Sequence, residues 1–385
     1  MLIAVGKLLP GPQPGHVRHS RVSPFYMSSN PARDITAVAV GNGFKAYARW
    51  PEYFARYGRR EPPSVTHTPF SFAWGHPELP PWEVKALFPE YAASFARSMK
   101  SRQIVGGDMK LVGPEALYDM SWLGEEARRR ASGGDDDSAV VAVDVGGGLG
   151  QLLRDIVTSV PGVAAGQCVL QDRKEVIEEA AAAAAAGGVI QEVRMMEHDF
   201  HIEQPVKGTY IHSLPTLTCL ILRRPLPQKH PHHLLFPSPK RKENNTNQPT
   251  PPSPLFFQTN KKNQIKPKAN HPSPETTGAA IYLLRRILLD YPDSLAINIL
   301  RHLAEALPPT ESNPRARILI MEERLLDDGP PVPQNRIVDL VMLSIGGKLR
   351  DEKIMTSLAT AAGLRVVGFH ARPGEPACVV ECARA

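Results

Sequence analysis

The chain has 385 residues, enough for two domains of ordinary size, and its 42% apolar and 22% charged residues make a globular composition. No apolar run reaches the roughly 20 residues that a membrane span needs, and residues 1–6 are too short an apolar start for a signal peptide, so we expect a cytoplasmic protein with no membrane partner. The net charge of +6 does not indicate nucleic-acid binding, because residues 209–277 hold ten Lys and Arg against two Glu and the rest of the chain is slightly acidic.

Helical spacing dominates residues 1–130, which we expect to form a helical N-terminal domain. Apolar residues recur at helical intervals over residues 82–99, on both sides of Pro89, and residues 43–50 follow the same pattern. A polar stretch, GGDDDS at residues 133–138, predicts a linker or surface turn. The second domain is then expected over residues 131–385.

Strands alternate with helices from Ala139 onward. The first strand is a nearly continuous apolar run, as expected when both faces of a parallel strand are buried. The alternation predicts an α/β fold with a doubly wound sheet, and a Pro-Gly turn near the end predicts a closing hairpin with one antiparallel strand. Strands are expected at 139–145, 168–172, 193–199, 280–284, 317–322, 365–370 and 377–382, and helices at 149–160, 175–186, 294–307 and 353–362.

Residues 209–277 interrupt this pattern. They hold thirteen of the chain's 38 prolines and no glycine, and their polar runs have neither helical nor strand periodicity. Such a segment cannot bury enough apolar surface to offset its ordering entropy, so we expect a disordered insertion. Joining Gly208 to Ala279 would restore a short loop before a strand. We hypothesise a translated intron, and the alternative is a genuine loop.

A run of glycines follows the first strand and opens a helix. Residues 143–150 read VDVGGGLG. Glycine lets the backbone approach a ligand and take positive φ, and the following helix N-terminus favours anionic groups. The spacing is not the G-x-G-x-x-G of nicotinamide-binding folds. The alternative is a tight turn without a ligand.

Acidic residues end the next two strands. Asp172 can accept both hydroxyls of a ribose, as in other nucleoside-binding folds, although alone such a residue is more often a helix cap or a surface charge. Asp199 could accept from an adenine amino group with Phe200 packed on the ring, or it could be one of several polar loop groups.

These motifs together resemble the plant and fungal S-adenosylmethionine-dependent O-methyltransferases of small molecules. The likeness runs through VDVGGGLG, LQDR (170–173), HDF (198–200) and EQPVKG (203–208), and resumes with LRRILLDYPD (284–293), IME (320–322) and GGK (346–348). It implies a Rossmann-like class I methyltransferase domain that binds S-adenosylmethionine. The donor site carried over from the family comprises Gly146, Gly148, Asp172, Asp199, Phe200 and Arg285.

The same resemblance implies an N-terminal, winged-helix-like dimerisation unit. Residues 15–23, GHVRHSRVS, are similar to the end of that unit. Most of the winged helix would then be missing from this N-terminus, which weakens the expectation of a homodimer.

The catalytic positions depart from the family. Glu322 matches the family's first assisting glutamate and Asp290 is kept, but Leu289 stands where the family has a histidine base and Leu349 where it has a second glutamate. Leucine cannot take the proton of a hydroxyl nucleophile. Three interpretations follow: methylation of an acidic hydroxyl by proximity alone, a different reaction such as a rearrangement or cyclisation, or an inactive donor-binding protein. In addition, Asp290 could only position the strand end, and the glutamates could be surface charges.

The expected acceptor is a hydroxyl of a small molecule, which the resemblance places in fungal secondary metabolism. No metal site is expected. The four cysteines have no zinc spacing, and the histidines at 230–233 lie in the proline-rich segment without a second ligand cluster.

Overall fold

The computed structural model describes residues 8–20, 23, 34, 38, 43–105, 109–132, 140–185, 187, 189–207, 278–311, 313–326 and 333–385. The described residues cluster into one compact unit, which lies within residues 1–210 and 272–385. The insertion expected at 209–277 and the linker expected at 133–138 lie outside the described residues. Within the described part of the chain, no helix is both long and apolar enough to cross a membrane.

Helices fill the first third of the chain after a small antiparallel hairpin of β1 (Leu8–Pro10) and β2 (Val17–His19). The helical pattern predicted around Pro89 corresponds to α5 and α6, which that proline separates because it suits the first turn of a helix and not its interior. The helices α3, α4 and α7 have no counterpart among the predicted elements. The set is α2 (Gly43–Ala48), α3 (Trp50–Tyr57), α4 (Pro69–Ala73), α5 (Pro81–Ala86), α6 (Pro89–Val105) and α7 (Ser121–Ser132).

A seven-stranded sheet follows, in the order β5-β4-β3-β6-β7-β9-β8. Strand β9 is antiparallel to both of its neighbours, and the other pairs are parallel, which confirms the predicted doubly wound sheet with a closing hairpin. The strands are β3 (Ala142–Val145), β4 (Cys168–Asp172), β5 (Arg194–Glu197), β6 (Ile281–Arg285), β7 (Arg317–Glu323), β8 (Leu364–Ala371) and β9 (Ala377–Arg384).

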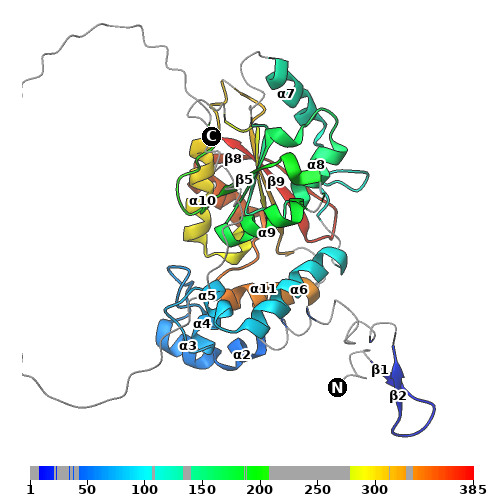
Figure 1. Ribbon diagram of the computed structural model, residues 1–385. Coiled ribbons are helices and arrows are strands. Elements are labelled where there is room, and N and C mark those ends of the chain that lie inside the picture. The colour runs from blue at the N-terminus through cyan, green and yellow to red at the C-terminus, as the bar shows by residue number, and fades with distance from the viewer. Residues whose placement is uncertain are drawn as a thin grey trace, which may run out of the picture. The chain divides into compact units, whose positions relative to one another are not determined.

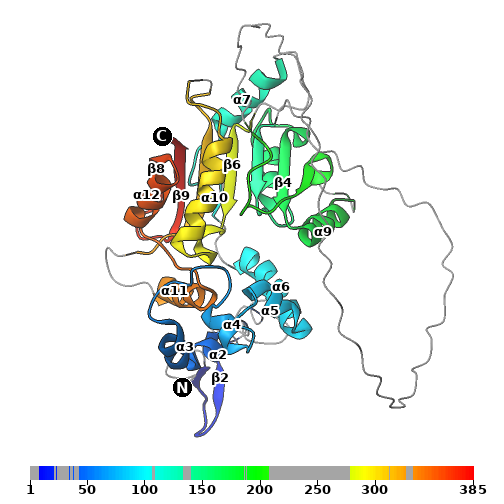
Figure 2. The same ribbon diagram turned by 90° about the vertical axis from the view of Figure 1, so that its left-hand side faces the viewer.

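Helices cover both faces of the sheet, so its central strands are buried on both sides. Alternate residues of β6 point in opposite directions: Tyr282 and Leu284 pack under α10 (Asp293–Ala306) and α12 (Glu352–Ala361), and Ile281 and Leu283 pack under α7 and α8 (Gln151–Ser159). Figures 1 and 2 show these two helical layers. The remaining elements are α9 (Lys174–Ala185) and the short 3-10 helices η3 (Ala165–Gln167), η4 (Val189–Glu192) and η5 (Leu288–Asp290).

One helix of the second half of the chain packs with the N-terminal helices. Helix α11 (Pro333–Ile345), which the sequence pattern did not predict, contacts α2 and α4 as well as η5. In Figure 2 it lies beside α4, below the ends of β6 and α10. The carboxyl ends of the strands therefore face helices drawn from both halves of the chain.

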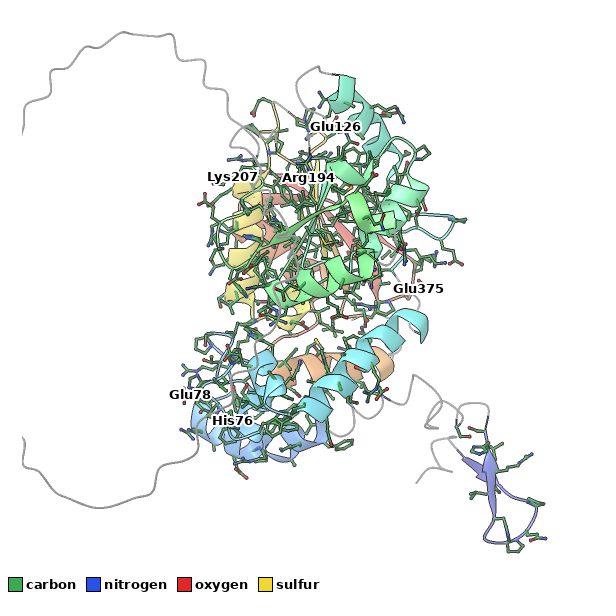
Figure 3. All side chains as sticks on the ribbon, viewed as in Figure 1. His76, Glu78, Glu126, Arg194, Lys207 and Glu375 are labelled. Carbon is green, nitrogen blue, oxygen red and sulfur yellow. The ribbon has the colours of Figure 1, made fainter. Side chains whose placement is uncertain are left out.

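The amino ends of the strands carry a separate polar cluster. Glu126 of α7 is buried and pairs with Arg129 at 2.6 Å and Arg130 at 2.9 Å. Arg130 also donates to the carbonyls of Val140 and Gly278, at 2.7 Å each, and so ties α7 to the chain entering β3 and β6. Figure 3 shows Glu126 at the end of the molecule away from His76 and Glu78 of the N-terminal helical region.

Candidate functional site

The three-glycine turn and the acid ending β4 lie together. Gly146 and Gly148 have positive φ, 67° and 62°, which a side chain would strain. The Gly148 N–H donates to Asp172 Oδ2 at 2.9 Å, and the Gly146 N–H donates to the Gln171 carbonyl at 2.8 Å. The turn is thus held open against the end of the neighbouring strand, in the arrangement that the sequence predicts.

Asp144 lies beneath this turn with an unsatisfied charge. Its side chain is 1% exposed, and neither of its carboxylate oxygens has a hydrogen-bond partner among the described residues. Burial raises the pKa of Asp144 to about 7, which the positive charge of Arg285 partly offsets and the negative charge of Asp172 reinforces. A Cβ at Gly147 would lie 2.5 Å from this carboxylate, so glycine is required there. A buried, unpaired acid is costly unless it meets a cation or a donor.

Aromatic rings border the turn on one side. A Cβ at Gly146 would lie 3.5 Å from the ring of Phe200, and Phe200 makes an edge contact with Tyr291 at 5.8 Å. His201 packs on both rings, and burial lowers its pKa. Asp199 is exposed. Its Oδ1 accepts a hydrogen bond of 2.9 Å from the backbone N–H of His201, two residues further along the same turn. Phe200 is therefore close to the glycine turn, whereas Asp199 faces solvent.

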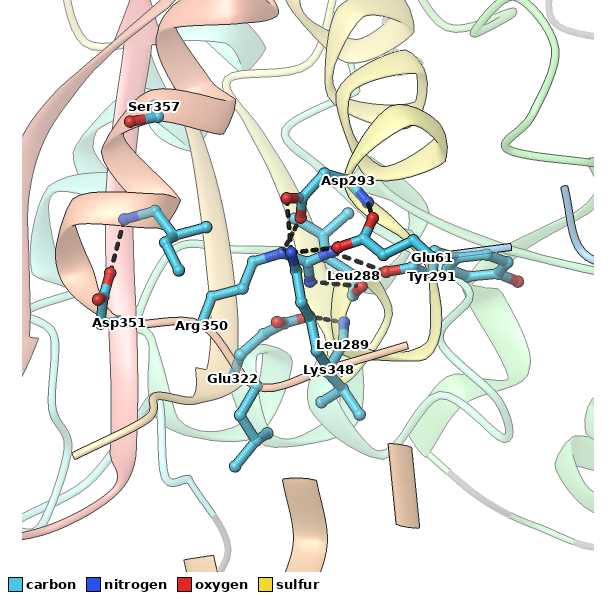
Figure 4. A network of polar contacts seen from close by, with 12 residues as sticks. Glu61, Leu288, Leu289, Tyr291, Asp293, Glu322, Lys348, Arg350, Asp351 and Ser357 are labelled. Atoms are coloured by element: carbon cyan, nitrogen blue, oxygen red, sulfur yellow. Dashed lines mark hydrogen bonds and ion pairs between the residues drawn. The ribbon is translucent and has the colours of Figure 1, made fainter. Parts of the chain in front are cut away.

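The turn after β6 is fixed by a polar network that the sequence did not predict. Arg350 is 1% exposed and donates to the carbonyls of Leu288 at 2.8 Å and Tyr291 at 2.7 Å, while its Nε pairs with Asp293 at 2.9 Å. Figure 4 shows these groups converging on η5. The only sequence signal for Arg350 is its position two residues after Gly346-Gly347-Lys348. That position does not show whether the arginine is buried or lies on the surface.

This network also reaches the N-terminal helical region. Lys348 forms ion pairs with Asp293, at 2.6 Å, and with Glu61, and Glu61 accepts from the Asp293 N–H at 3.1 Å. The segment between α3 and α4 is therefore tied to the start of α10. This contact sets the position of the N-terminal helices over the carboxyl edge of the sheet.

Glu322 lies inside the same network, 3% exposed. Its Oε1 accepts from the Leu289 N–H at 3.0 Å. Burial raises the pKa of Glu322 to about 7, against the opposing effects of Arg350 and of the backbone donors of Leu289 and Leu288. The Glu322 carboxylate thus holds the backbone of η5 in place through this hydrogen bond. Its catalytic role remains a prediction.

Asp290 and Leu289 leave η5 in different directions. Asp290 is exposed, whereas Leu289 is 6% exposed and belongs to a buried apolar cluster with Leu349 and Met342 of α11. Leu289 and Leu349, the two positions at which the sequence analysis expects catalytic groups to be missing, are therefore part of one apolar cluster. Among the described residues, no group of three or more His, Cys, Asp or Glu could hold a metal ion.

The sequence is similar to those of known methyltransferases. The family model of the O-methyltransferase domain matches residues 255–365. The methyltransferase cfoD of Aspergillus candidus is 32% identical over 388 residues, covering 100% of this chain and 74% of the relative.

Solved structures agree in fold. The complex of LepI with SAM has a TM-score of 0.61 at 17% identity, and a pericyclic reaction enzyme has a TM-score of 0.62 at 18% identity. In each case the match covers 100% of this chain and 74% of the other chain.

Proposed function

The chain belongs to the S-adenosylmethionine-dependent O-methyltransferase family, and from that premise we propose that it transfers the methyl group to an acidic hydroxyl of a small secondary metabolite. The observation that supports this most directly is the glycine turn, hydrogen-bonded to Asp172 above an unpaired buried acid. When bound, S-adenosylmethionine supplies an electrophilic methyl group on a positively charged sulfur.

The residues around the turn fit this donor. Asp172 uses one lone pair of each oxygen on the backbone, at Gly148 and Arg173, and keeps others for ribose hydroxyls. The unpartnered Asp144 carboxylate offers a counter-charge to the cationic donor. Gly146, Gly148 and Phe200 form the wall beside it, and Arg285 contributes positive charge near Asp144.

The protein's own part in the reaction is orientation. Glu322 and Arg350 hold the backbone of η5, and the contact of Glu61 with Asp293 holds the N-terminal helices opposite it. Holding two reactants in an aligned pair can supply several kcal/mol of the barrier, about 7–11 in well-oriented cases. An acceptor whose hydroxyl is already acidic would need little catalysis beyond this orientation.

Titration calorimetry of the full chain with S-adenosylmethionine tests the donor site. We expect saturable binding by the wild-type protein and at least tenfold weaker binding by Asp172→Asn, which removes one acceptor oxygen and the negative charge. Asp155→Asn is the matched control, because Asp155 is an exposed carboxylate on α8 that is paired with Arg154. Absence of heat with the wild-type chain, or equal affinity for all three proteins, would falsify the donor site.

A second candidate function is favoured by the apolar cluster of Leu289 and Leu349. A donor-binding protein with no base at these positions could promote a rearrangement or cyclisation, and one structural neighbour is a pericyclic reaction enzyme. The mass of the product separates the candidates. Methyl transfer adds one CH₂ to the acceptor and consumes the donor, whereas a rearrangement leaves both masses unchanged.

A further inference from the structure

Two buried glutamines form a polar pair behind the end of β4. Gln171, the penultimate residue of that strand, is 0% exposed, and Gln204, in the segment after β5, is 1% exposed. The Gln171 Nε2 donates to Gln204 Oε1 at 2.7 Å, and the Gln204 Nε2 donates to Gln171 Oε1 at 2.9 Å. Each amide therefore serves the other as both donor and acceptor.

A backbone donor fixes the orientation of this pair. The Val206 N–H also donates to Gln204 Oε1, at 3.1 Å. A backbone N–H can only donate, so the oxygen of the Gln204 amide must face Val206 and Gln171 Nε2. Val206 is held in turn, because its carbonyl accepts from the Tyr282 hydroxyl of β6. The two amides are thus anchored to the segment after β5 and to a central strand.

The backbone of Gln171 supports the glycine turn. Its carbonyl accepts from the N–H groups of Gly146, at 2.8 Å, and of Gly147, at 3.1 Å. The side chain of the next residue, Asp172, accepts from the Gly148 N–H at 2.9 Å. Three consecutive N–H groups of the turn therefore bind to two consecutive residues of β4. A rotation of this part of the β4 backbone would move both acceptors together and change the shape of the turn.

The surroundings of the pair are apolar. Val206 belongs to the main apolar core and Met196 packs against it. The Gln171 Nε2 also lies 3.2 Å from Met196 Sδ, which is only a weak acceptor. Two apolar side chains of similar size could fill this space without any need for hydrogen bonds, whereas a satisfied polar pair specifies one arrangement of the groups that it joins. The glutamines therefore contribute a defined orientation at the end of β4.

We propose that Gln204 is a positioning residue for the methyl donor: acting through Gln171, it holds the glycine turn in the shape that binds S-adenosylmethionine. This assignment rests on the proposed function, because it concerns the same donor site. It extends the determinants of donor affinity to residues 203–206, just before the expected insertion. A turn that is already in its binding shape does not have to be ordered when the donor arrives, and this raises the affinity.

Calorimetry of the full chain with S-adenosylmethionine, together with thermal unfolding, tests the assignment. Gln204→Leu leaves the Gln171 amide and the Val206 N–H unpaired, so we expect a lower melting temperature and at least about tenfold weaker donor binding. Gln167→Leu is the matched control, because Gln167 is also a buried, hydrogen-bonded glutamine but lies before the other end of β4. This variant should lower the melting temperature as well and leave the donor affinity within about twofold of the wild type.

Two further variants separate positioning from stability. Gln171→Leu/Gln204→Leu leaves neither amide unpaired, so it should regain part of the melting temperature that Gln204→Leu loses, but not the donor affinity. Gln204→Glu should bind the donor within about threefold of the wild type at about pH 6, where a buried carboxyl stays protonated and can both donate and accept. At about pH 8.5 it should bind more weakly than the wild type, because an ionised carboxylate cannot donate to Gln171 Oε1. Comparison at each pH cancels the titration of Asp144.

The possible failures of the two proposals are distinguishable. Wild-type affinity in Gln204→Leu, an equal loss of affinity in Gln167→Leu, or a double variant that regains both properties would overturn the positioning role alone. A wild-type chain that does not bind S-adenosylmethionine would overturn the proposed function, and the positioning role with it.

Discussion

The Asp144 carboxylate is expected to weaken the fold at neutral pH. In the unfolded chain the pKa is near 3.8, and in the folded protein burial raises it to about 7. Below about pH 4 both states are protonated and the residue costs nothing. As the pH rises from there to about 7, only the unfolded state loses its proton, so the free energy of unfolding falls, by up to about 4 kcal/mol, and then levels off.

Asp144→Asn should remove this pH dependence. We expect the variant to melt at a higher temperature than the wild type at pH 8, to differ little at pH 4, and to bind S-adenosylmethionine more weakly. Thermal unfolding at both pH values and calorimetry provide the measurements. A variant that is less stable than the wild type at pH 8 would contradict the buried, unpaired carboxylate.

Glu322 is expected to be a positioning residue, because its Oε1 accepts from the Leu289 N–H. Glu322→Gln keeps an acceptor oxygen and should cost less than about 1 kcal/mol, whereas Glu322→Ala leaves a buried donor unpaired and should cost about 1–3 kcal/mol. Turnover should follow the same order. If Glu322→Gln lost as much kcat as Glu322→Ala while remaining stable, the glutamate would instead act on the proton of the acceptor.

At the level of elements, Gly347 controls the shape of η5. A Cβ at this position would lie 2.0 Å from the Leu289 carbonyl oxygen and 2.7 Å from the Asp290 carbonyl carbon, both of them backbone atoms. Gly347→Ala must therefore displace η5, at a cost of about 1–3 kcal/mol, and lower turnover at least tenfold. Gly166→Ala is the matched control, because nothing lies within 4 Å of the added Cβ. Equal melting temperatures of the two variants would contradict this reading.

The strands of the sheet could be predicted closely, since β4 has the predicted bounds Cys168–Asp172 and β7 extends one residue beyond its prediction. Burial on both faces gives the central strands β3, β6 and β7 nearly continuous apolar runs. Helix α11 was missed because it is apolar on more than one side: Ile337 and Leu340 are exposed while Met342 is buried, and this pattern has no single helical face.

The candidate site could be predicted where its residues lie next to each other on consecutive strands, as Gly148 and Asp172 do. Arg350 could not, because its role depends on which distant segments pack across the carboxyl edge. Nothing in the local sequence around Arg350 indicates that it donates to the carbonyls of Leu288 and Tyr291. Long-range packing decides these contacts, and one sequence does not encode it as a pattern.

At the scale of the whole molecule, described residues on either side of the expected insertion lie close together. The Tyr282 hydroxyl donates a hydrogen bond to the Val206 carbonyl. The backbone of Ala279 also forms a hydrogen bond with the Tyr282 hydroxyl. Val206 and Ala279 are both fully buried in the same core. A chain segment of any length that connects Val206 to Ala279 therefore starts and finishes at positions that are close together in the fold.

Deletion of residues 209–277 should then be tolerated. Because composition predicts no structure for this segment, shortening it should stabilise the protein by about 2 kcal/mol, at about 0.6 kcal/mol for each halving of a flexible loop. Affinity for S-adenosylmethionine should stay within threefold of the full chain. Loss of cooperative unfolding in the shortened protein would show that the segment contributes to the fold.

The meeting of Val206 and Ala279 at Tyr282 has a further consequence for engineering. The continuity of the polypeptide between them adds little to the fold, so the protein should work in two pieces. Residues 1–208 carry the glycine turn and Asp172, and residues 278–385 carry η5, Glu322 and Arg350. Co-expressed as separate polypeptides, the halves should complement each other and regain donor binding that neither has alone, which would make this junction a natural place for a split reporter.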